Sequence, residues 1–158
     1  MTRAGGHWLE LKVPPLIVAL IAAGAMLALS YVAPILSFTL PGRVAVAVTL
    51  AVLGTALALA GVMAFRELRT TVNPLTPEAS SALVSGGVYR FTRNPMYLGF
   101  LLWLAGWAAY LANAGAALLL PAFVLYMSRF QIKPEERALH ARFGAGFEAY
   151  ASRVRRWL

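Results

Sequence analysis

The sequence predicts an all-α fold: an integral membrane bundle of about four transmembrane helices, with a short helical cytoplasmic tail at the C-terminus. Hydrophobic residues make up 60% of the 158 residues, and charged residues make up only 13%. Soluble domains carry about 45–50% apolar and about 25% charged residues, so this composition indicates that lipid is the main solvent. The length favours a single domain over residues 1–158.

The first two spans are predicted from uncharged apolar runs over residues 13–36 and 44–65. Each run is long enough for a helix across a hydrocarbon core of about 30 Å. Basic residues before the first run and small residues inside it also fit a signal peptide, but its long apolar core favours an uncleaved helix. In the second run, Gly54 and Gly61 are expected to permit close helix approach.

The last two spans are predicted from one apolar run over residues 96–128. As a single helix this run would be about 50 Å long, which is too long for one crossing. Asn113 lies near its middle, in a stretch typical of a turn. We therefore expect two helices, over about 95–112 and 114–132, joined by a tight hairpin. Pro121 is expected to kink the second of them.

The basic residues predict the orientation of these spans. Apart from Arg43, they lie before the first span, in the loop over residues 66–94, or at and beyond the end of the fourth span. The positive-inside rule is satisfied if both termini and this loop face the cytoplasm at the inner membrane. The loop and the tail over residues 133–158 then meet at one face, where chemistry on a water-soluble cosubstrate belongs.

Composition excludes several classes of site. The chain has no Cys, no Asp and only two His, so a disulfide framework, a thiolate metal site and most other metal chemistry are not expected. The net charge of +8 is assigned to anionic lipid headgroups rather than to nucleic acid, because the basic residues flank apolar runs. Arg153, Arg155 and Arg156 near the C-terminus are assigned to headgroups in the same way.

Two polar segments at the predicted cytoplasmic face carry the candidate chemistry. In the loop, Asn94 is expected to cap the third span, with Pro95 in its first helical position; local chemistry alone favours an ordinary connector. In the tail, Pro134 can start a helix with Glu135 and Glu136 in its first turn, where acids complement the helix dipole. Two adjacent acids beside a span can also hold a cationic group, such as a sulfonium or an amine, at the lipid boundary.

An apolar face follows in the tail and can lie on the membrane surface or pack against the bundle. Gly144 and Gly146 weaken this helix and are expected to break it in two. The members of the apolar series, which recur at helical spacing, are Leu139, Phe143, Phe147, Tyr150 and Val154.

Both segments carry motifs of a known family. Residues 82–99 read ALVSGGVYRFTRNPMYLG, and residues 135–150 begin with EERAL, followed by FG and a Tyr. At these residues the chain resembles the isoprenylcysteine carboxyl methyltransferase family and, more distantly, the phospholipid N-methyltransferases. The resemblance covers roughly the C-terminal half. It implies a small helical membrane bundle that binds S-adenosyl-L-methionine and methylates a lipophilic or membrane-associated small acceptor at the cytoplasmic face.

The resemblance also implies which residues form the site. Glu135 would hold the cationic part of the cofactor, with Glu136 beside it. Catalytic roles would fall to Arg129, Gln131 and Glu135. The full set of implied cofactor-binding residues is Ser81, Ala82, Leu83, Val84, Tyr89, Arg93, Asn94, Pro95, Met96, Tyr97, Glu135 and Glu136.

Two residues depart from the family pattern. Asn94 stands where the family has a His before the Pro, and its amide can donate and accept hydrogen bonds but cannot titrate. Gln131 stands where prenylcysteine enzymes have an Arg that meets the substrate carboxylate, and Arg129 would point elsewhere on a helix. A prenylcysteine carboxylate is therefore disfavoured, and the acceptor stays open among a carboxylate, an amine and a thiol.

Two other functions stay open. Sterol reductases, which use NADPH, look similar in their C-terminal bundle, although their chains are much longer. A non-enzymatic membrane bundle could retain the motifs, but both motifs are intact, which speaks against it. The expected partners are the lipid bilayer and a lipophilic acceptor, with no nucleic acid and no metal.

Overall fold

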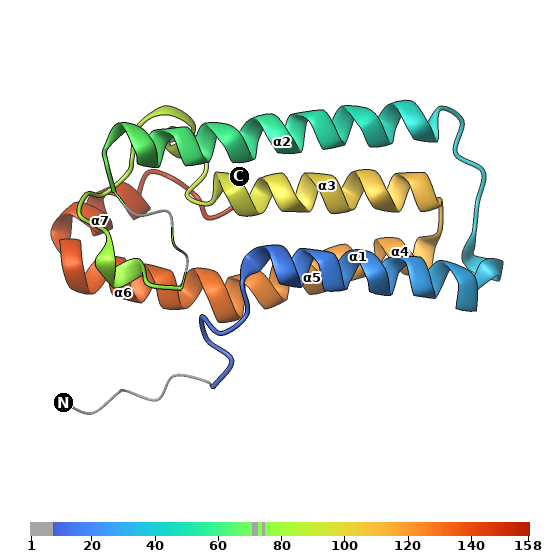
Figure 1. Ribbon diagram of the computed structural model, residues 1–158, viewed down its shortest axis with the longest axis horizontal. Coiled ribbons are helices and arrows are strands. Elements are labelled where there is room, and N and C mark those ends of the chain that lie inside the picture. Colours follow the sequence, from blue (N-terminus) through green and yellow to red (C-terminus); the bar gives the residue numbers. More distant parts are fainter. Residues whose placement is uncertain (1–7, 71–72, 74) are drawn as a thin grey trace.

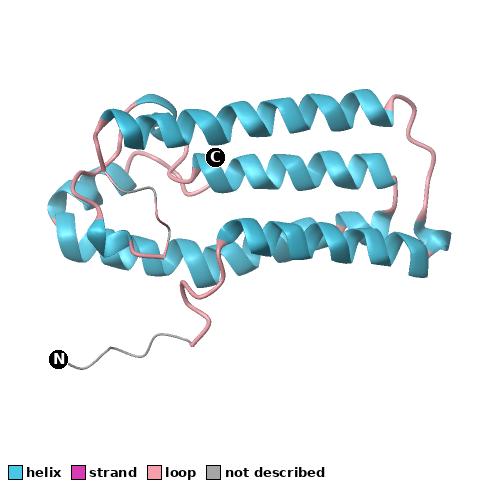
Figure 2. Cartoon of the chain, viewed as in Figure 1, coloured by secondary structure: helices cyan, strands magenta, loops and turns pink. Residues whose placement is uncertain are grey.

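The protein is all-helical in the part that the computed structural model describes, which is residues 8–70, 73 and 75–158 (Figure 2). The expected cytoplasmic N-terminus lies outside these residues. Within them there is no strand, only an isolated bridge between Ser37 and Asn113. The helices are α1 (Pro15–Val32), α2 (Arg43–Glu67), α3 (Pro95–Leu111), α4 (Ala114–Ala117), α5 (Leu119–Met127), α6 (Lys133–Phe143) and α7 (Ala145–Ala151), with a π-helical turn at Ser128–Ile132 and 3-10 turns at Pro34–Leu36, Pro77–Ala79 and Gly87–Arg90.

The long helices run side by side, with α3 between α2 on one side and α1 and α5 on the other (Figure 1). At one end of the bundle, α2 ends, α3 begins, and α6 and α7 are found (Figure 1). The α1–α2 connection and the α3–α4 turn lie at the opposite end. The two polar segments singled out in the sequence therefore share one end of the bundle.

Within the described residues, three helical segments are long and apolar enough to cross a membrane: α1, α2 and the stretch Ala114–Phe143, which runs from α4 to α6. The helix α3 is a shorter apolar helix. Large hydrophobic side chains are exposed on the outer faces, such as Ile21 at 64% and Val52 at 61%, as expected where lipid covers the surface. The all-helical membrane architecture is confirmed, and the number of four spans stays a prediction.

Glycines bring α2 and α3 into close contact. A Cβ atom placed at Gly54 would lie 2.6 Å from the carbonyl oxygen of Gly99. Gly61 faces the start of α3, where its Cβ would lie 3.1 Å from Met96. The close approach expected for Gly54 and Gly61 is therefore confirmed, and it lets the two backbones pack directly.

The hairpin predicted around Asn113 is also confirmed. Ala112 has a left-handed backbone with φ 48°, and Asn113 Oδ1 accepts a hydrogen bond from the backbone N–H of Ala116 at 3.0 Å, capping α4. Asn113 Nδ2 donates to the carbonyl oxygen of Ala33 at 3.0 Å, which ties the turn to the end of α1. The break between α4 and α5 lies just before Pro121, which cannot donate to the preceding turn.

The tail does not start a new helix at Pro134, as the sequence suggested, but continues from α5 through the π-helical turn into α6. Pro134 cannot donate to the carbonyl of Phe130. That carbonyl instead accepts from the backbone N–H of Leu11 at 3.0 Å, so the chain needs no break there. The helix does break at Gly144, whose φ of 50° ends α6, as predicted.

Gly54→Val is expected to destabilise the protein by about 1–3 kcal/mol, because the new side chain would collide with the backbone of α3. Thermal unfolding of the purified protein in detergent measures the effect. Gly24→Ala is the control, since Gly24 in α1 is exposed and no atom of a neighbouring element among the described residues lies within 4 Å of its Cβ position. A Gly54→Val protein as stable as the wild type would contradict the close contact between α2 and α3.

Candidate functional site

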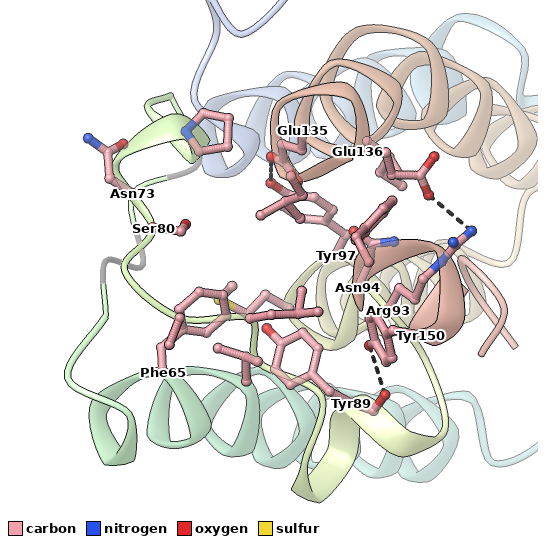
Figure 3. Close-up of a pocket in the computed structure, with 18 residues that line it drawn as sticks. Phe65, Asn73, Ser80, Tyr89, Arg93, Asn94, Tyr97, Glu135, Glu136 and Tyr150 are labelled. Carbon is pink, nitrogen blue, oxygen red and sulfur yellow. Dashed lines mark hydrogen bonds and ion pairs between the residues drawn. The ribbon is translucent and has the colours of Figure 1, made fainter. Parts of the chain in front are cut away.

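A cavity lies at the end of the bundle where α2 ends, α3 begins, and α6 and α7 pack together (Figure 3). Both polar segments contribute to it, one from the loop before α3 and the other from α6. Residues far apart in the sequence thus converge on one space, as the sequence predicts. The lining residues are Phe65, Asn73, Pro77, Ser80, Ala82, Leu83, Val84, Tyr89, Arg93, Asn94, Met96, Tyr97, Ile132, Glu135, Glu136, Leu139, Phe147 and Tyr150.

Glu135, in the first turn of α6, meets the start of α3 at the wall of this cavity (Figure 3). The hydroxyl of Tyr97, in the first turn of α3, donates a hydrogen bond to Glu135 Oε1. Within the described part of the chain, Glu135 takes part in no ion pair. A partly buried carboxylate without a counter-ion is costly, so this position can accommodate a cationic group.

Glu136, its neighbour on α6, is matched by two arginines. Its Oε1 lies 3.0 Å from Nη2 of Arg93. Arg156 donates to the same carboxylate from Nε at 2.9 and 3.0 Å and from Nη2 at 2.6 Å. Charge-assisted bidentate pairs of this kind are among the strong hydrogen bonds of proteins. The two adjacent glutamates therefore differ: Glu136 is bound to the protein's own cations, and Glu135 binds a neutral hydroxyl.

Asn94 precedes α3 at the predicted cap position, but its side chain does not cap the helix. Its Nδ2 instead donates to the carbonyl oxygen of Arg156 at 2.9 Å, and Thr92 Oγ1 donates to the same oxygen at 3.2 Å. The capping role predicted for Asn94 is wrong, because the C-terminal segment passes beside the start of α3 and accepts the hydrogen bond of the Asn94 side-chain amide. Arg93 lies between Thr92 and Asn94 in the sequence, and its buried Nε has no hydrogen-bond partner among the described residues.

Apolar and aromatic side chains form the remaining wall. Val84, Tyr89, Phe147 and Tyr150 belong to one buried cluster, and the Tyr150 hydroxyl donates to the carbonyl oxygen of Tyr89 at 2.8 Å. Burial raises the pKa of Tyr150 to about 12, against the opposite influence of Arg93, and burial also raises the pKa of Tyr89 well above its usual value. Both phenols are therefore protonated at neutral pH. The apolar face of the tail thus packs against the bundle.

A model of the phospholipid methyltransferase family matches residues 42–146, from just before α2 to the start of α7. The chain belongs to the phospholipid methyltransferase family. This finding confirms the resemblance carried by the two motifs, and with the long apolar helices it identifies the protein as a member of a family of membrane methyltransferases.

Several relatives are named protein-S-isoprenylcysteine O-methyltransferases. Form B of Arabidopsis thaliana is 33% identical over 109 residues, which is 67% of this chain and 54% of the relative. The protein of Schizosaccharomyces pombe is 36% identical over 75 residues, 46% of this chain and 30% of the relative. An uncharacterised protein of Haemophilus influenzae is 43% identical over 63 residues, 40% of this chain and 100% of the relative. The chain spans about half or less of the named methyltransferases, and no solved structure matches it.

Most cofactor-binding residues implied by the family motifs line the cavity. Ser81 is exposed and Pro95 is buried, and neither belongs to the lining. The backbone N–H of Ser81 donates instead to Oγ1 of Thr70 at 2.9 Å, which holds this part of the loop to the end of α2. The implied residues that do line the cavity are Ala82, Leu83, Val84, Tyr89, Arg93, Asn94, Met96, Tyr97, Glu135 and Glu136.

Arg129 and Gln131 are not brought to the cavity. Both lie in the π-helical turn and contact the segment before α1. Arg129 Nη1 lies 2.7 Å from Glu10 Oε1 in an ion pair, and Gln131, which is 1% exposed, donates from Nε2 to the carbonyl oxygen of Val13. Of the three residues expected to be catalytic, only Glu135 lines the cavity, so position does not support the roles expected for the other two.

Several lining residues lie outside the set implied by the motifs. Some of them, such as Leu139 and Tyr150, belong to the apolar series of the tail, which signals a buried face but not the cavity that it lines. Phe65 in the last turn of α2 carries no local signal, because one aromatic residue in an apolar span is also typical of a lipid-facing position. The residues outside the set are Phe65, Asn73, Pro77, Ser80, Ile132, Leu139, Phe147 and Tyr150.

Tyr150→Phe is expected to lower the free energy of unfolding by about 1–3 kcal/mol, because the carbonyl of Tyr89 loses a buried donor. The wild type is also expected to lose stability as the pH rises from about 10 to about 12. In this window the folded state keeps the phenolic proton that the unfolded state releases, so stability falls with rising pH. Thermal unfolding in detergent across this range measures both effects.

Tyr31→Phe is the control for this substitution, since Tyr31 is exposed at 78%. It is expected to leave the stability at neutral pH unchanged. An alkaline dependence that is identical in the wild type and in Tyr150→Phe would show that Tyr150 does not keep its proton through folding.

Proposed function

We propose that the protein transfers a methyl group from S-adenosyl-L-methionine to a lipophilic or membrane-associated small acceptor at the cytoplasmic face of the inner membrane. The contrast between the two adjacent glutamates carries the proposal. Glu136 is paired with Arg93 and Arg156, whereas Glu135 bonds to the neutral hydroxyl of Tyr97 and, among the described residues, to no cation. The positively charged end of the cofactor would be the counter-ion that Glu135 lacks among the described residues.

The chemistry of the cavity wall fits this cofactor. When bound, S-adenosyl-L-methionine would supply an activated methyl group on a sulfonium. Glu135 would hold its cationic end, and the N–H of Arg93 Nε, which has no partner in the described chain, is a donor for its carboxylate. Phe65, Leu139 and Phe147 offer apolar surface for the adenosine part. The protein's own work would then be to orient the donor and to exclude water.

We further propose one domain with four spans, in which α3 crosses the membrane together with α1, α2 and the α4–α5 segment. The 17 residues of α3 rise about 26 Å, close to the hydrocarbon thickness of about 30 Å. The cavity end of the bundle holds the basic residues of the loop and of the tail, whereas Arg43 begins α2 at the opposite end (Figure 1). The positive-inside rule therefore favours a cytoplasmic cavity.

The charges around the cavity favour an acceptor that reacts through an amine or a thiol rather than a carboxylate. Arg93, the arginine in the lining, is already paired with Glu136. Arg129 is paired with Glu10 away from the cavity, and Gln131 is buried against the segment before α1. A carboxylate acceptor would therefore have to compete for Arg93 both with Glu136 and with the carboxylate of the cofactor.

Titration calorimetry with S-adenosylhomocysteine in detergent tests the cofactor site. The wild type is expected to bind with a dissociation constant on the order of micromolar. Glu135→Gln is expected to weaken binding by roughly tenfold or more, because a charge-assisted contact is lost. Glu148→Gln is the matched control, since Glu148 is exposed and pairs with His140 outside the cavity. A wild type that binds no S-adenosylhomocysteine but is stabilised by NADPH in a thermal-shift assay would overturn the proposal in favour of a reductase.

Methyl transfer is tested in cells fed deuterated methionine. Cells that express the wild type are expected to accumulate a lipophilic product with a deuterated methyl group, which cells expressing Glu135→Gln lack. Mass spectrometry of lipid extracts detects the product, and its fragmentation shows whether nitrogen, sulfur or a carboxylate carries the methyl group. Identical label in cells with and without the gene would favour a non-enzymatic bundle.

A further inference from the structure

The C-terminal segment after α7 returns to the start of α3 (Figure 1). The carbonyl oxygen of Arg155 accepts from the backbone N–H of Arg93 at 2.9 Å, and that of Arg156 accepts from Asn94 Nδ2 at 2.9 Å. The segment therefore joins the loop residues that line the cavity. It lies beyond residues 42–146, which are those matched to the family.

The side chain of Arg156 approaches the cavity from outside. It is not part of the lining, and its guanidinium binds Glu136 from a second, shallow groove that also includes Lys133, Arg137 and His140. The side chain of Glu136 is 16% exposed and that of Arg156 is 39% exposed. Arg156 thus touches the lining through its side-chain bonds to Glu136 and its backbone bond to Asn94.

We infer that Arg156 is a positioning residue of the cofactor site, which holds Glu136 and the start of α3 in place around a ligand bound at Glu135. The inference rests on the function proposed above. The planar guanidinium fixes both oxygens of Glu136, and the carbonyl of the same residue fixes the amide of Asn94. A displacement of about 1 Å in groups that contact a ligand is enough to weaken its binding substantially.

A positioning role and a plain charge effect predict opposite results. If Arg156 acted only as a nearby positive charge, its removal would make the cavity more negative and would favour the cation S-adenosylmethionine over S-adenosylhomocysteine. If Arg156 positions Glu136 and Asn94, its removal weakens the binding of both ligands alike. The two ligands differ by one methyl group and one positive charge, so their ratio reports the charge effect.

Titration of both ligands into the purified whole chain tests the inference. Arg156→Gln is expected to weaken both by roughly tenfold or more. Arg156→Lys is expected to recover little, because an ammonium group cannot form the bidentate pair. Arg155→Gln is the matched control in the same segment, since the side chain of Arg155 is exposed and the contact to Arg93 uses its backbone. It is expected to bind as the wild type does.

A double-mutant cycle with Glu136→Gln shows whether Arg156 acts through Glu136. Arg156→Gln is expected to add little to Glu136→Gln, so the two effects on binding are non-additive. Thermal unfolding of each variant reports whether it is folded. If Arg156→Gln is not folded, Arg156→Lys replaces it in the same cycle. Unchanged binding, additive effects or a gain for S-adenosylmethionine would overturn this inference alone, whereas a wild type that binds neither ligand would overturn the proposed function with it.

Discussion

The interaction on which the cavity depends is the pairing of Glu136 with arginines from two distant parts of the chain. Arg93 comes from the loop before α3 and Arg156 from the C-terminal segment, and both reach one carboxylate at the start of α6. Because a partly buried charge must be matched, the three segments cannot separate without leaving an unpaired ion. This constraint joins α3 to α6. It also gives Glu135 a different character from its neighbour, since its described partner is the neutral hydroxyl of Tyr97.

Lipid imposes the second constraint. Helices in a bilayer gain little from burying apolar side chains against one another, so their contact relies on close backbone packing. The helices α2 and α3 achieve this at Gly54 and Gly99, and Gly54 and Gly61 are the buried residues of α2, whose other faces are left to lipid. The 3-10 turns and the connecting loops lie at the ends of the helices, where irregular backbone can find partners outside the hydrocarbon. A cavity at such an end would adjoin both phases, as the proposed polar donor and lipophilic acceptor require.

Features that depend on a few neighbouring residues could be predicted from the sequence. The hairpin at Asn113, the break at Gly144 and the close approach at Gly54 each follow from the chemistry of one residue type. Family motifs located most of the lining in the loop and on α6, including Glu135. The contacts of Arg156 with Glu136 and Asn94 could not be predicted in this way, because an arginine near the end of a basic tail is typical of a headgroup contact. Only the path of the chain shows that it returns to the cavity.

The π-helical turn explains the largest departure from the sequence-based expectations. Each residue inserted into a helix rotates all later positions by about 100°, so a π turn before α6 changes which side chains face the cavity. Here Gln131 contacts the segment before α1, whereas Glu135 faces α3. Hydrophobic periodicity does not predict this turn, because the turn involves a contact with a distant part of the chain. Pro134 cannot donate to the carbonyl of Phe130, which instead accepts a hydrogen bond from the backbone N–H of Leu11. The segment before α1, far in sequence from either motif, therefore contacts this turn through Leu11 and Val13.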